Sequence, residues 1–265
     1  MKIALINENS QAAKNAIIEK ALKKVAEPLG HTVDNYGMYT AEDKAQLTYV
    51  QNGILACVLL NSGAADFVVT GCGTGEGAML ALNSFPNVIC GHVATPLDAY
   101  TFAQINDGNA IAIPFALGFG WGGDLNLEYI FEKLFSEPFG GGYPKERAVP
   151  EKRNKKILDE VRKVTLNQDV PAILKGLDRE LVVGALSGEH FRELFAKRNV
   201  VCLCGHVHST ELADWYGDGG HITQMTMNSV WYKEELGTYK VLYQGAAQYG
   251  EKRKKQAKLD IILYM

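Results

Sequence analysis

The sequence has little of what marks a nucleic-acid-binding, membrane-spanning or secreted protein. Its formal net charge at pH 7 is only −3, so no basic excess favours a nucleic-acid partner. No apolar run approaches the roughly 20 residues of a membrane span. Met1–Ile6 is strand-like without a signal-peptide pattern, and the five cysteines lack the spacing of a disulfide framework. We therefore expect a cytoplasmic protein with reduced thiols, no nucleic-acid partner and no membrane association.

Strand-like and helix-like segments alternate over about the first 135 residues. The strand candidates are short, mostly apolar stretches: Lys2–Asn7, a stretch from His31, Phe67–Thr70, Val88–Cys90 and Ala110–Pro114. The helix candidates are a stretch capped by Ser10 and running to Lys24, then Gln46–Leu60, Ala78–Leu82, Pro96–Gln104 and Leu127–Phe135. This alternation predicts an α/β fold with a five-stranded parallel sheet covered by helices on both faces.

The remaining sequence has a different character. A charged helix is expected from about Glu151 to Val164, and it either packs on a partner subunit or presents a solvated face. Asp169–Ala196 has the pattern of two or three short helices. Val200–Met265 is rich in strand-like residues, with candidates at Thr223–Trp231, Thr238–Gln244 and Lys258–Tyr264. We therefore expect an α/β domain over 1–165, a helical segment over 166–198 and a small β-rich C-terminal extension over 199–265.

The most informative stretch is Gly71–Gly77, which has four glycines among seven residues. It joins a strand candidate to a helix candidate, and glycines permit backbone conformations that a Cβ would forbid. Free N–H groups at a helix start suit an anionic oxygen, and a thiol there ionises more readily than a free cysteine. Ligands of parallel sheets bind beyond the carboxyl ends of the strands, where we place this turn with Asn7–Asn9 and Asn106–Asn109. The turn is either a binding and proton-transfer site or a tight connection with incidental side chains.

Four motifs in the first 165 residues resemble the ribose-5-phosphate isomerase B / galactose-6-phosphate isomerase family. They are the pair Glu8-Asn9, the turn Cys72-Gly73-Thr74-Gly75, the segment Asn106-Asp107-Gly108-Asn109, and Gly140–Gly142 followed by basic residues, all in family order. The resemblance implies a Rossmann-like αβα sandwich, a homodimer or dimer of dimers, no cofactor and no metal. It also implies that a phosphorylated aldose and ketose are interconverted through an enediol.

The resemblance offers two residues for the base that moves a proton between neighbouring carbons. In one branch of the family the base is a cysteine at the position of Cys72, and in another it is a glutamate at the position of Glu76. This sequence has both. We favour Cys72, because a thiolate at a helix N-terminus needs no further partner. Glu76 would then be a second acid/base or a first-turn helix residue.

Further substrate contacts are implied by the resemblance, residue by residue. Glu8 stands where the family has an aspartate that binds substrate hydroxyls, and Asn9 where it has a histidine near the phosphate. Thr74 and the amides of the turn would hold the enediolate oxygen and neighbouring hydroxyls. The remaining candidates are Gly73, Gly75 and Gly77 of the turn, Tyr49 and Asn106 for substrate contact, and Arg147 and Arg153 for the phosphate, with both arginines reaching a partner subunit.

One position departs from the family pattern and bears on the substrate. Ribose isomerases carry a ring-opening histidine just before the Asn-Asp pair, where this sequence has Ile105. A sugar that is mainly open-chain, such as a tetrose 4-phosphate, needs no such group. Alternatively His92 opens the ring, although a buried, hydrogen-bonded histidine is the commoner case. We take ribose 5-phosphate as the leading substrate, with a tetrose or hexose phosphate as alternatives.

The C-terminal part raises a competing function. Strand-like residues run into Gly205-His206-Val207-His208, which resembles the last metal-binding motif of calcineurin-like metallophosphoesterases. The other segments that complete such a two-metal site are missing, so a metal-dependent phosphohydrolase is the alternative and not the leading hypothesis. A third hypothesis is a binding module that keeps the sugar-phosphate pocket without catalysis.

Overall fold

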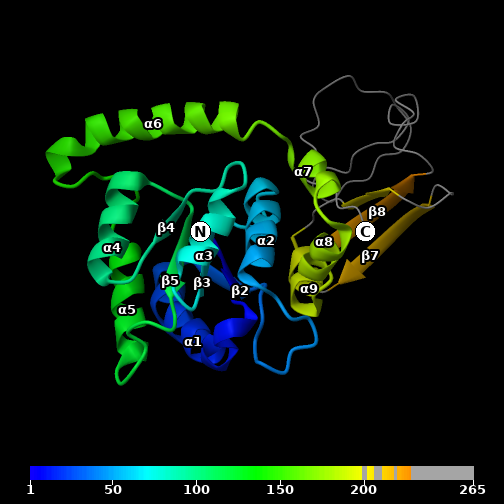
Figure 1. Cartoon of the computed structure of the whole chain (residues 1–265), viewed down its shortest axis with the longest axis horizontal. Coiled ribbons are helices and arrows are strands. Elements are labelled where there is room, and N and C mark those ends of the chain that lie inside the picture. Colours follow the sequence, from blue (N-terminus) through cyan, green and yellow to red (C-terminus); the bar gives the residue numbers. More distant parts are fainter. Residues whose placement is uncertain (199–201, 206–210, 218–219, 228–265) are drawn as a thin grey trace.

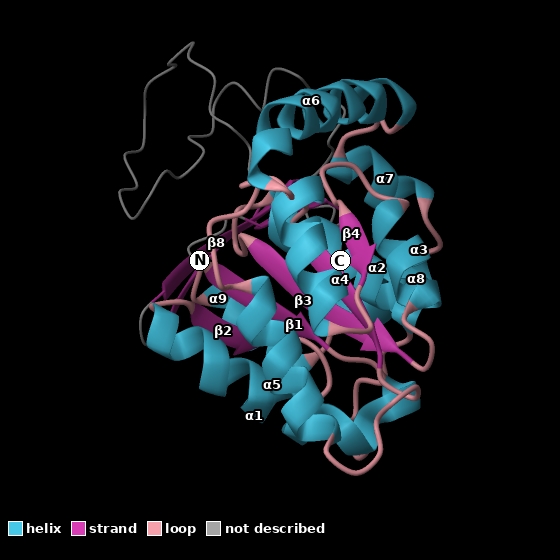
Figure 2. Cartoon of the chain, turned by 90° about the vertical axis from the view of Figure 1, so that its left-hand side faces the viewer, coloured by secondary structure: helices cyan, strands magenta, loops and turns pink. Residues whose placement is uncertain are grey.

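The computed structural model describes residues 1–198, 202–205, 211–217 and 220–227. Its centre is an all-parallel sheet of five strands in the order β2-β1-β3-β5-β4. Helices cover both faces of this sheet (Figure 1, Figure 2), which confirms the predicted Rossmann-like sandwich. The strands are β1 (Lys2–Ile6), β2 (Thr32–Asn35), β3 (Phe67–Cys72), β4 (Cys90–His92) and β5 (Ala110–Pro114).

Two apolar cores hold the helices against the two faces of the sheet. The helices are α1 (Asn15–Ala26), α2 (Tyr49–Asn61), α3 (Glu76–Asn83), α4 (Pro96–Thr101) and α5 (Gly123–Leu134). Ile6 and Val68 point to the core under α2 and α3, whereas Leu5 and Val69 point to the core under α1, α4 and α5. The division follows from the strand pleat, which sends successive side chains to opposite faces. The central strand β3 is buried along its whole length.

Polar caps set where the first 3-10 segment and α2 begin. After β1 the Glu8 carboxylate accepts the backbone N–H of Ser10 at 2.8 Å, and a 3-10 segment (Asn9–Lys14) precedes α1. The predicted cap at Ser10 is therefore wrong, because the acidic side chain two residues earlier takes the free N–H. α2 begins at Tyr49, where Thr48 and Gln51 form a capping box.

Two parts of the chain follow the sandwich. α6 (Ala148–Thr165) buries none of its side chains and extends along the top of Figure 1. Three short helices, as the sequence pattern predicted, then pack beside α2 and extend its core: α7 (Val170–Gly176), α8 (Arg179–Leu186) and α9 (Glu189–Ala196). Among the described residues, no helix is long and apolar enough to cross a membrane.

The described part of the C-terminal extension forms a three-stranded sheet in the order β6-β8-β7. The strands are β6 (Cys202–Gly205), β7 (Glu211–Gly217) and β8 (Gly220–Met227), with β8 parallel to β6 and antiparallel to β7. β8 overlaps the strand candidate Thr223–Trp231. The candidates Thr238–Gln244 and Lys258–Tyr264 lie outside the described residues.

The two ends of the central sheet separate segments that we expected to lie together. The loops after β2 and β5 lie at the bottom of Figure 1, so the carboxyl ends of the strands face down in that view. Asn7–Asn9 and the glycine turn lie at this end, as predicted. Asn106–Asn109 instead precedes β5, and the Asn109 carbonyl accepts the N–H of Val68 near the start of β3. Its predicted placement is wrong, because a segment that leads into a parallel strand lies at the amino end of the sheet.

Candidate active site

The turn between β3 and α3 is shaped by its glycines and by one imidazole. Gly75 precedes α3 with φ at +76°, the left-handed region that favours glycine. His92, at the end of β4, donates from Nε2 to the Thr74 carbonyl at 2.8 Å, and a Cβ on Gly75 would lie 3.0 Å from the His92 ring. Position 75 thus needs glycine for two reasons. His92 is half-buried and hydrogen-bonded, the commoner of the two roles expected for it.

Cys72 lies at the junction between the central strand and this turn. It is the last residue of β3, is only 6% exposed and has a free thiol. Glu76 is the first residue of α3 and is exposed. The backbone N–H groups in the first turn of α3 have no partner within the helix, and this turn begins four residues after Cys72. The thiol is therefore shielded from bulk water beside potential oxyanion donors, while the Glu76 side chain is solvated.

Tyr49 packs against the first turn of α3. Its ring lies 3.3 Å from the position that a Cβ on Gly77 would take, so glycine there leaves room for the ring. Tyr49 is 44% exposed, so it is accessible to a ligand. Gln51, which forms the capping box of α2 together with Thr48, lies against Gly184 of α8. A Cβ added to Gly184 would be 2.5 Å from Gln51 Nε2. The helical segment thereby supports the start of α2, and through it Tyr49.

Buried polar groups gather where β1 ends. Asn7 is 1% exposed, and neither polar atom of its side chain has a hydrogen-bond partner among the described residues. Glu8 is 4% exposed, while Asn9 is exposed and binds the Leu47 carbonyl through its backbone N–H at 2.9 Å. A buried amide with unused donors and acceptors, next to a buried carboxylate, suits the hydroxyls of a sugar. Sequence reasoning named Glu8 and Asn9 as site residues and placed Asn7 at the same end of the sheet without giving it a role.

Two further polar side chains, Gln11 and Lys14, belong to the 3-10 segment after Glu8. Lys14 Nζ donates to Gln11 Oε1 at 2.7 Å and also to the Phe115 carbonyl. Gln11 Nε2 is 4.0 Å from the position that a Cβ on Gly73 would take. Sequence reasoning missed both residues, because the contact between Lys14 and Phe115 joins positions 101 apart and leaves no local signal.

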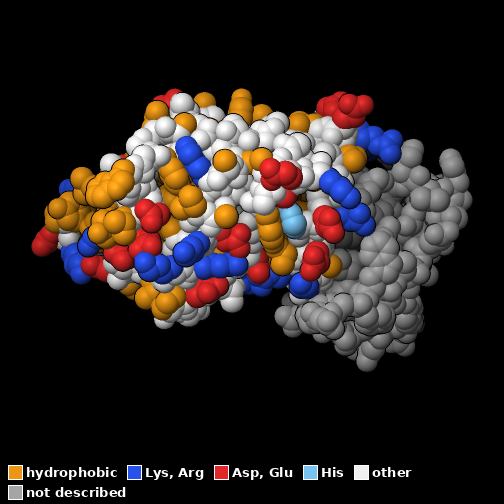
Figure 3. Space-filling view, turned by 90° about the horizontal axis from the view of Figure 1, so that it is seen from below, with side chains coloured by type: hydrophobic (Ala, Val, Ile, Leu, Met, Phe, Trp, Pro, Cys, Tyr) orange, Lys and Arg blue, Asp and Glu red, His pale blue; other side chains and the backbone are white. Residues whose placement is uncertain are grey.

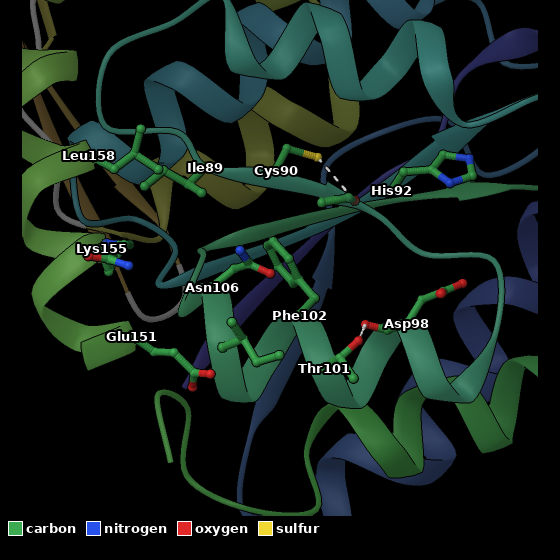
Figure 4. Close-up of a pocket in the computed structure, with 13 residues that line it drawn as sticks. Ile89, Cys90, His92, Asp98, Thr101, Phe102, Asn106, Glu151, Lys155 and Leu158 are labelled. Atoms are coloured by element: carbon green, nitrogen blue, oxygen red, sulfur yellow. Dashed lines mark hydrogen bonds between the residues drawn. The ribbon is translucent and has the colours of Figure 1, made fainter. Parts of the chain in front are cut away.

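A groove of about 600 Å³ runs along the edge strand β4 and separates it from α6. Ile105 and Asn106 line it from the end of the α4 region, and Glu151, Lys155 and Leu158 line it from α6 (Figure 4). Cys72 is not among its lining residues. Asn106 precedes β5, whereas Cys72 pairs with Pro114 at the far end of that strand, so the fold does not bring Asn106 to the Cys72 turn within one chain.

The two predicted phosphate ligands also lie apart from the Cys72 turn. Arg147 is the last residue of the 3-10 segment Lys145–Arg147, and Arg153 lies on α6. Both are exposed, and neither guanidinium makes a hydrogen bond or ion pair within the part of the chain that the structure describes. The described ranges also contain no cluster of three or more side chains able to hold a metal ion. His206 and His208 lie outside those ranges.

Figure 3 views the molecule from the carboxyl ends of the strands. Basic and acidic side chains are interspersed over the middle of this face, and hydrophobic side chains gather at its left-hand end. The loop after β5 has two strongly exposed apolar residues, Leu117 at 60% and Trp121 at 104%. This loop starts at the glycine turn, because the Ala116 N–H donates to the Gly73 carbonyl at 2.9 Å.

Comparisons with known proteins identify relatives. Residues 3–148 match the family described as ribose/galactose isomerase, and residues 164–199 match a second family described as ribose-5-phosphate isomerase. Neither match reaches the Gly-His-x-His motif, so the metallophosphoesterase resemblance gains no support. The search of curated proteins found no match.

Solved structures give more detailed likenesses. A 4-deoxy-L-threo-5-hexosulose-uronate ketol-isomerase complexed with a tartrate is 62% identical, with a TM-score of 0.72 over 74% of this chain and 91% of that chain. A ribose-5-phosphate isomerase from Vibrio parahaemolyticus is 52% identical, with a TM-score of 0.71 over 74% of this chain and 91% of that chain. A type B ribose 5-phosphate isomerase from Trypanosoma cruzi is 17% identical, with a TM-score of 0.52 over 62% of this chain and 97% of that chain, and shows likeness of fold alone.

Proposed function

The chain belongs to the ribose/galactose isomerase family and is a sugar isomerase, and we propose that its substrate is an acidic sugar with an open chain. The observation that carries the isomerase chemistry of this proposal is Cys72, which is 6% exposed at the end of the central strand, next to the start of α3. Interconversion of an aldose and a ketose needs a base at the carbon beside the carbonyl and donors for the developing oxyanion. The glycine turn can supply both.

In the proposed reaction the Cys72 thiolate takes the proton from C2 of the aldose. The released electron pair forms the double bond of the enediolate, and the negative charge develops on O1, near the amides of the turn. The thiol then returns the proton to C1, and the hydroxyl proton on O2 passes to O1. The product is the ketose, with no net gain of atoms or electrons, so neither an oxidant nor a cofactor is needed.

The lack of a ring-opening group fits a substrate whose aldehyde cannot close the ordinary rings. The name of the substrate of the 62% identical relative describes six carbons without a hydroxyl at C4, with a carbonyl at C5 and with a terminal carboxylate. Such an aldehyde forms neither the usual furanose through O4 nor the pyranose through O5. Ile105 replaces the family's ring-opening histidine, and His92 Nε2 is already bonded to the Thr74 carbonyl. We therefore infer a 4-deoxy-5-keto uronate as the leading substrate.

The charge of the substrate supports the same choice. Asn9 stands where the family has a histidine near the phosphate, and an amide cannot carry a positive charge. A phosphate ester carries roughly −1.5 to −2 at pH 7, whereas a carboxylate carries about −1. A site with one cation fewer is better matched to the carboxylate.

Ribose 5-phosphate is the second candidate, because a ribose-5-phosphate isomerase that covers 74% of this chain is 52% identical to it. This substrate closes a furanose through O4, so it would have to open in solution or with help from another residue. The expected consequence is a lower kcat/KM for the pentose phosphate than for the open-chain uronate.

We also propose that a second copy of the chain completes the site. Asn106 lies before the start of β5, whereas Cys72 pairs with Pro114 at the end of β5. The two residues are therefore separated along the strand direction by at least four strand residues, about 13 Å. Arg147 and Arg153 are exposed on the segment that carries α6. α6 also displays apolar side chains that are not covered within the described part of the chain: Val149 (80% exposed), Ile157 (56%), Val161 (51%) and Val164 (75%). A second subunit against this surface would bring its Asn106 and arginines to the Cys72 turn.

The proposal is tested by comparing kcat/KM for 4-deoxy-L-threo-5-hexosulose uronate and ribose 5-phosphate. We expect the uronate to be preferred at least tenfold. A preference for the pentose phosphate that is lost in His92→Asn would replace the uronate with the pentose and make His92 the ring-opening group.

The role of Cys72 is tested in the same assay. Cys72→Ser should lower kcat at least ~100-fold, in the range for loss of a general base, and should abolish exchange of the C2 proton with deuterated solvent. Glu76→Gln is the matched control and should keep most of the activity. If instead Glu76→Gln is inactive and Cys72→Ser is not, the base is Glu76. Binding of sugar without any proton exchange in the unaltered protein would indicate a non-catalytic module.

A further inference from the structure

Lys14 is a half-buried lysine without a carboxylate partner among the described residues. Lys24 of α1, by contrast, does have a carboxylate partner, since its Nζ pairs with Glu128 at 2.7 Å. The ammonium of Lys14 is instead held by two neutral oxygens, Gln11 Oε1 and the Phe115 carbonyl. A positive charge that is partly desolvated among neutral partners gains from a bound anion. The arrangement is therefore that of an anion-binding group.

Lys14 and Gln11 both keep hydrogen-bond donors that no described residue uses. An ammonium group has three N–H donors, and two of those of Lys14 are used. The Phe119 ring, with its centroid 4.7 Å from Nζ, contacts the ammonium as well. Because Gln11 Oε1 accepts from Lys14, the two donors on Gln11 Nε2 are left, and this nitrogen lies 4.0 Å from the Cβ position of Gly73. An anion beside Gly73 could therefore accept from both side chains.

The distance between this pair and Cys72 suits a six-carbon substrate. Phe115 donates its backbone N–H to the Cys72 carbonyl at 2.9 Å, and its own carbonyl accepts from Lys14. The path from Lys14 Nζ to the Cys72 carbonyl thus consists of one hydrogen bond, the backbone of Phe115 and a second hydrogen bond. Lys14 Nζ therefore lies within roughly 9 Å of the Cys72 backbone. An extended six-carbon chain measures on the order of 6 Å between its terminal carbons, and a hydrogen bond adds roughly 3 Å.

From these contacts we propose that Lys14 and the side-chain amide of Gln11 bind the carboxylate at the far end of the substrate while C1 and C2 lie at Cys72. This assignment rests on the proposed function, because it gives a place to the acidic group of the proposed substrate. The carboxylate would accept a charge-assisted hydrogen bond from Nζ and a neutral one from Nε2. The pair thus sets specificity for an acidic sugar, and Cys72 carries out the proton transfer.

A binding experiment tests the proposal without relying on catalysis. D-gluconate is an open six-carbon chain with a carboxylate, and D-glucitol is the matching chain without a charge; neither has a carbonyl to isomerise. Calorimetry should show that the unaltered protein binds gluconate at least tenfold more tightly than glucitol, since a hydrogen bond to a charged group is stronger than one between neutral groups. Equal binding of the two probes by the unaltered protein would overturn the assignment.

Three variants show whether the preference belongs to this pair. Lys14→Met should remove the preference for gluconate, and Lys24→Met, on an exposed lysine of α1, should keep it. Gln11→Glu retains a hydrogen-bond acceptor for Lys14 but places a carboxylate beside it, so it should make glucitol the better ligand. Gln11→Glu also provides a second test should Lys14→Met fold poorly, as judged by its melting temperature. A gluconate preference that survives in Lys14→Met or Gln11→Glu would refute the proposal.

Kinetics then separate this proposal from the proposed function. If the uronate is the substrate, Lys14→Met should raise its KM at least tenfold and change kcat less than about threefold, with Lys14→Arg restoring much of the loss. An unaltered enzyme that isomerises the uronate, with the same KM in Lys14→Met, would retain the function and reject the carboxylate site. An enzyme inactive on the uronate whose gluconate preference still depends on Lys14 would retain the anion site and reject the function.

Discussion

α6 and the three helices that follow it differ in how they use their apolar residues. α6 has 18 residues, none of them buried. α7, α8 and α9 have 7, 8 and 8 residues, and each buries at least two apolar side chains against the core under α2. The longest helix of the described chain is thus the one that contributes least to the core of its own subunit.

The difference shows that the two parts meet different needs. The short helices lengthen the core and support α2, whose first residue is Tyr49. α6 is tied to the sandwich near its end by Arg162, which donates to the carbonyls of Phe85 and Val88. Its apolar residues remain exposed, as expected of a helix that meets a second subunit. Four predictions test this distinction.

The largest expected effect is recovery of activity when two inactive variants are mixed. Arg147→Ala or Arg153→Ala should remove the substrate contact supplied by the partner, and Cys72→Ser should remove the base. A mixed dimer has one site with both defects and one intact site, so random mixing in equal amounts should restore about a quarter of the sites. The measurement is kcat in the uronate assay before and after exchange of subunits.

The control for this mixing experiment is Arg179→Ala, on an exposed arginine of α8, which should remain active alone. Verified mixed dimers that stay inactive would show that the arginines do not complete the neighbouring site.

The second prediction concerns the apolar side chains of α6. Val161 is 51% exposed, so Val161→Asp should change the free energy of unfolding of the single subunit by no more than about 0.5 kcal/mol. In a dimer interface the added carboxylate would be buried without a partner, so the subunits should separate and activity should fall. Sedimentation measures the mass, and Lys163→Asp, at an exposed lysine of α6, should leave it unchanged. An intact dimer of Val161→Asp would place the interface elsewhere.

The third prediction is the counterpart in α9. Phe191 is 2% exposed and its ring stacks on that of Phe195 at a centroid distance of 4.9 Å. Phe191→Ala should lower the free energy of unfolding by about 3–5 kcal/mol, because it leaves a cavity in the core. Urea unfolding at several protein concentrations measures it. A loss below ~1 kcal/mol would mean that the short helices are not part of the cooperative core.

Local patterns in the sequence predicted the sandwich well. Alternating strands and helices identified the five strands of the sheet, and the bounds of β5 were predicted correctly as Ala110–Pro114. Four glycines in Gly71–Gly77 indicated the special turn, and Gly75 does adopt positive φ. The prediction placed β4 at Val88–Cys90, two residues before its observed start, because apolar residues also precede the strand. Each success depends on a periodicity or a backbone requirement within about ten residues.

Tertiary contacts explain what the sequence could not show. Lys14 contacts the Phe115 carbonyl only because the chain after β5 returns beside the chain after β1. Asn106 was placed at the wrong end of the sheet although its strand, Ala110–Pro114, was predicted correctly after it. The error came from applying the rule for segments that follow a strand to one that leads into a strand. The roles of Cys72, Glu8 and the arginines stay predictions, since they depend on proton transfer and on contacts between subunits.

The smallest expected effect concerns the contact between α9 and the loop after β2. The Tyr39 ring stacks on His190 at 3.7 Å between centroids, and His190 Nε2 bonds to Asp43 Oδ2 at 3.1 Å. Burial, assisted by nearby carboxylates, raises the pKa of Tyr39 to about 12. An unfolded tyrosine loses its proton near pH ~10, so the unfolded chain ionises first. The stability contributed by the neutral phenol is therefore lost as pH rises from about 10 to 12.

Urea unfolding at pH 9 and pH 11 should therefore show a smaller loss of stability in Tyr39→Phe than in the unaltered protein. Tyr129→Phe, on an exposed tyrosine of α5, is the control. Equal losses in Tyr39→Phe and the unaltered protein would mean that the stack is not maintained in solution and that α9 is held by its phenylalanines alone.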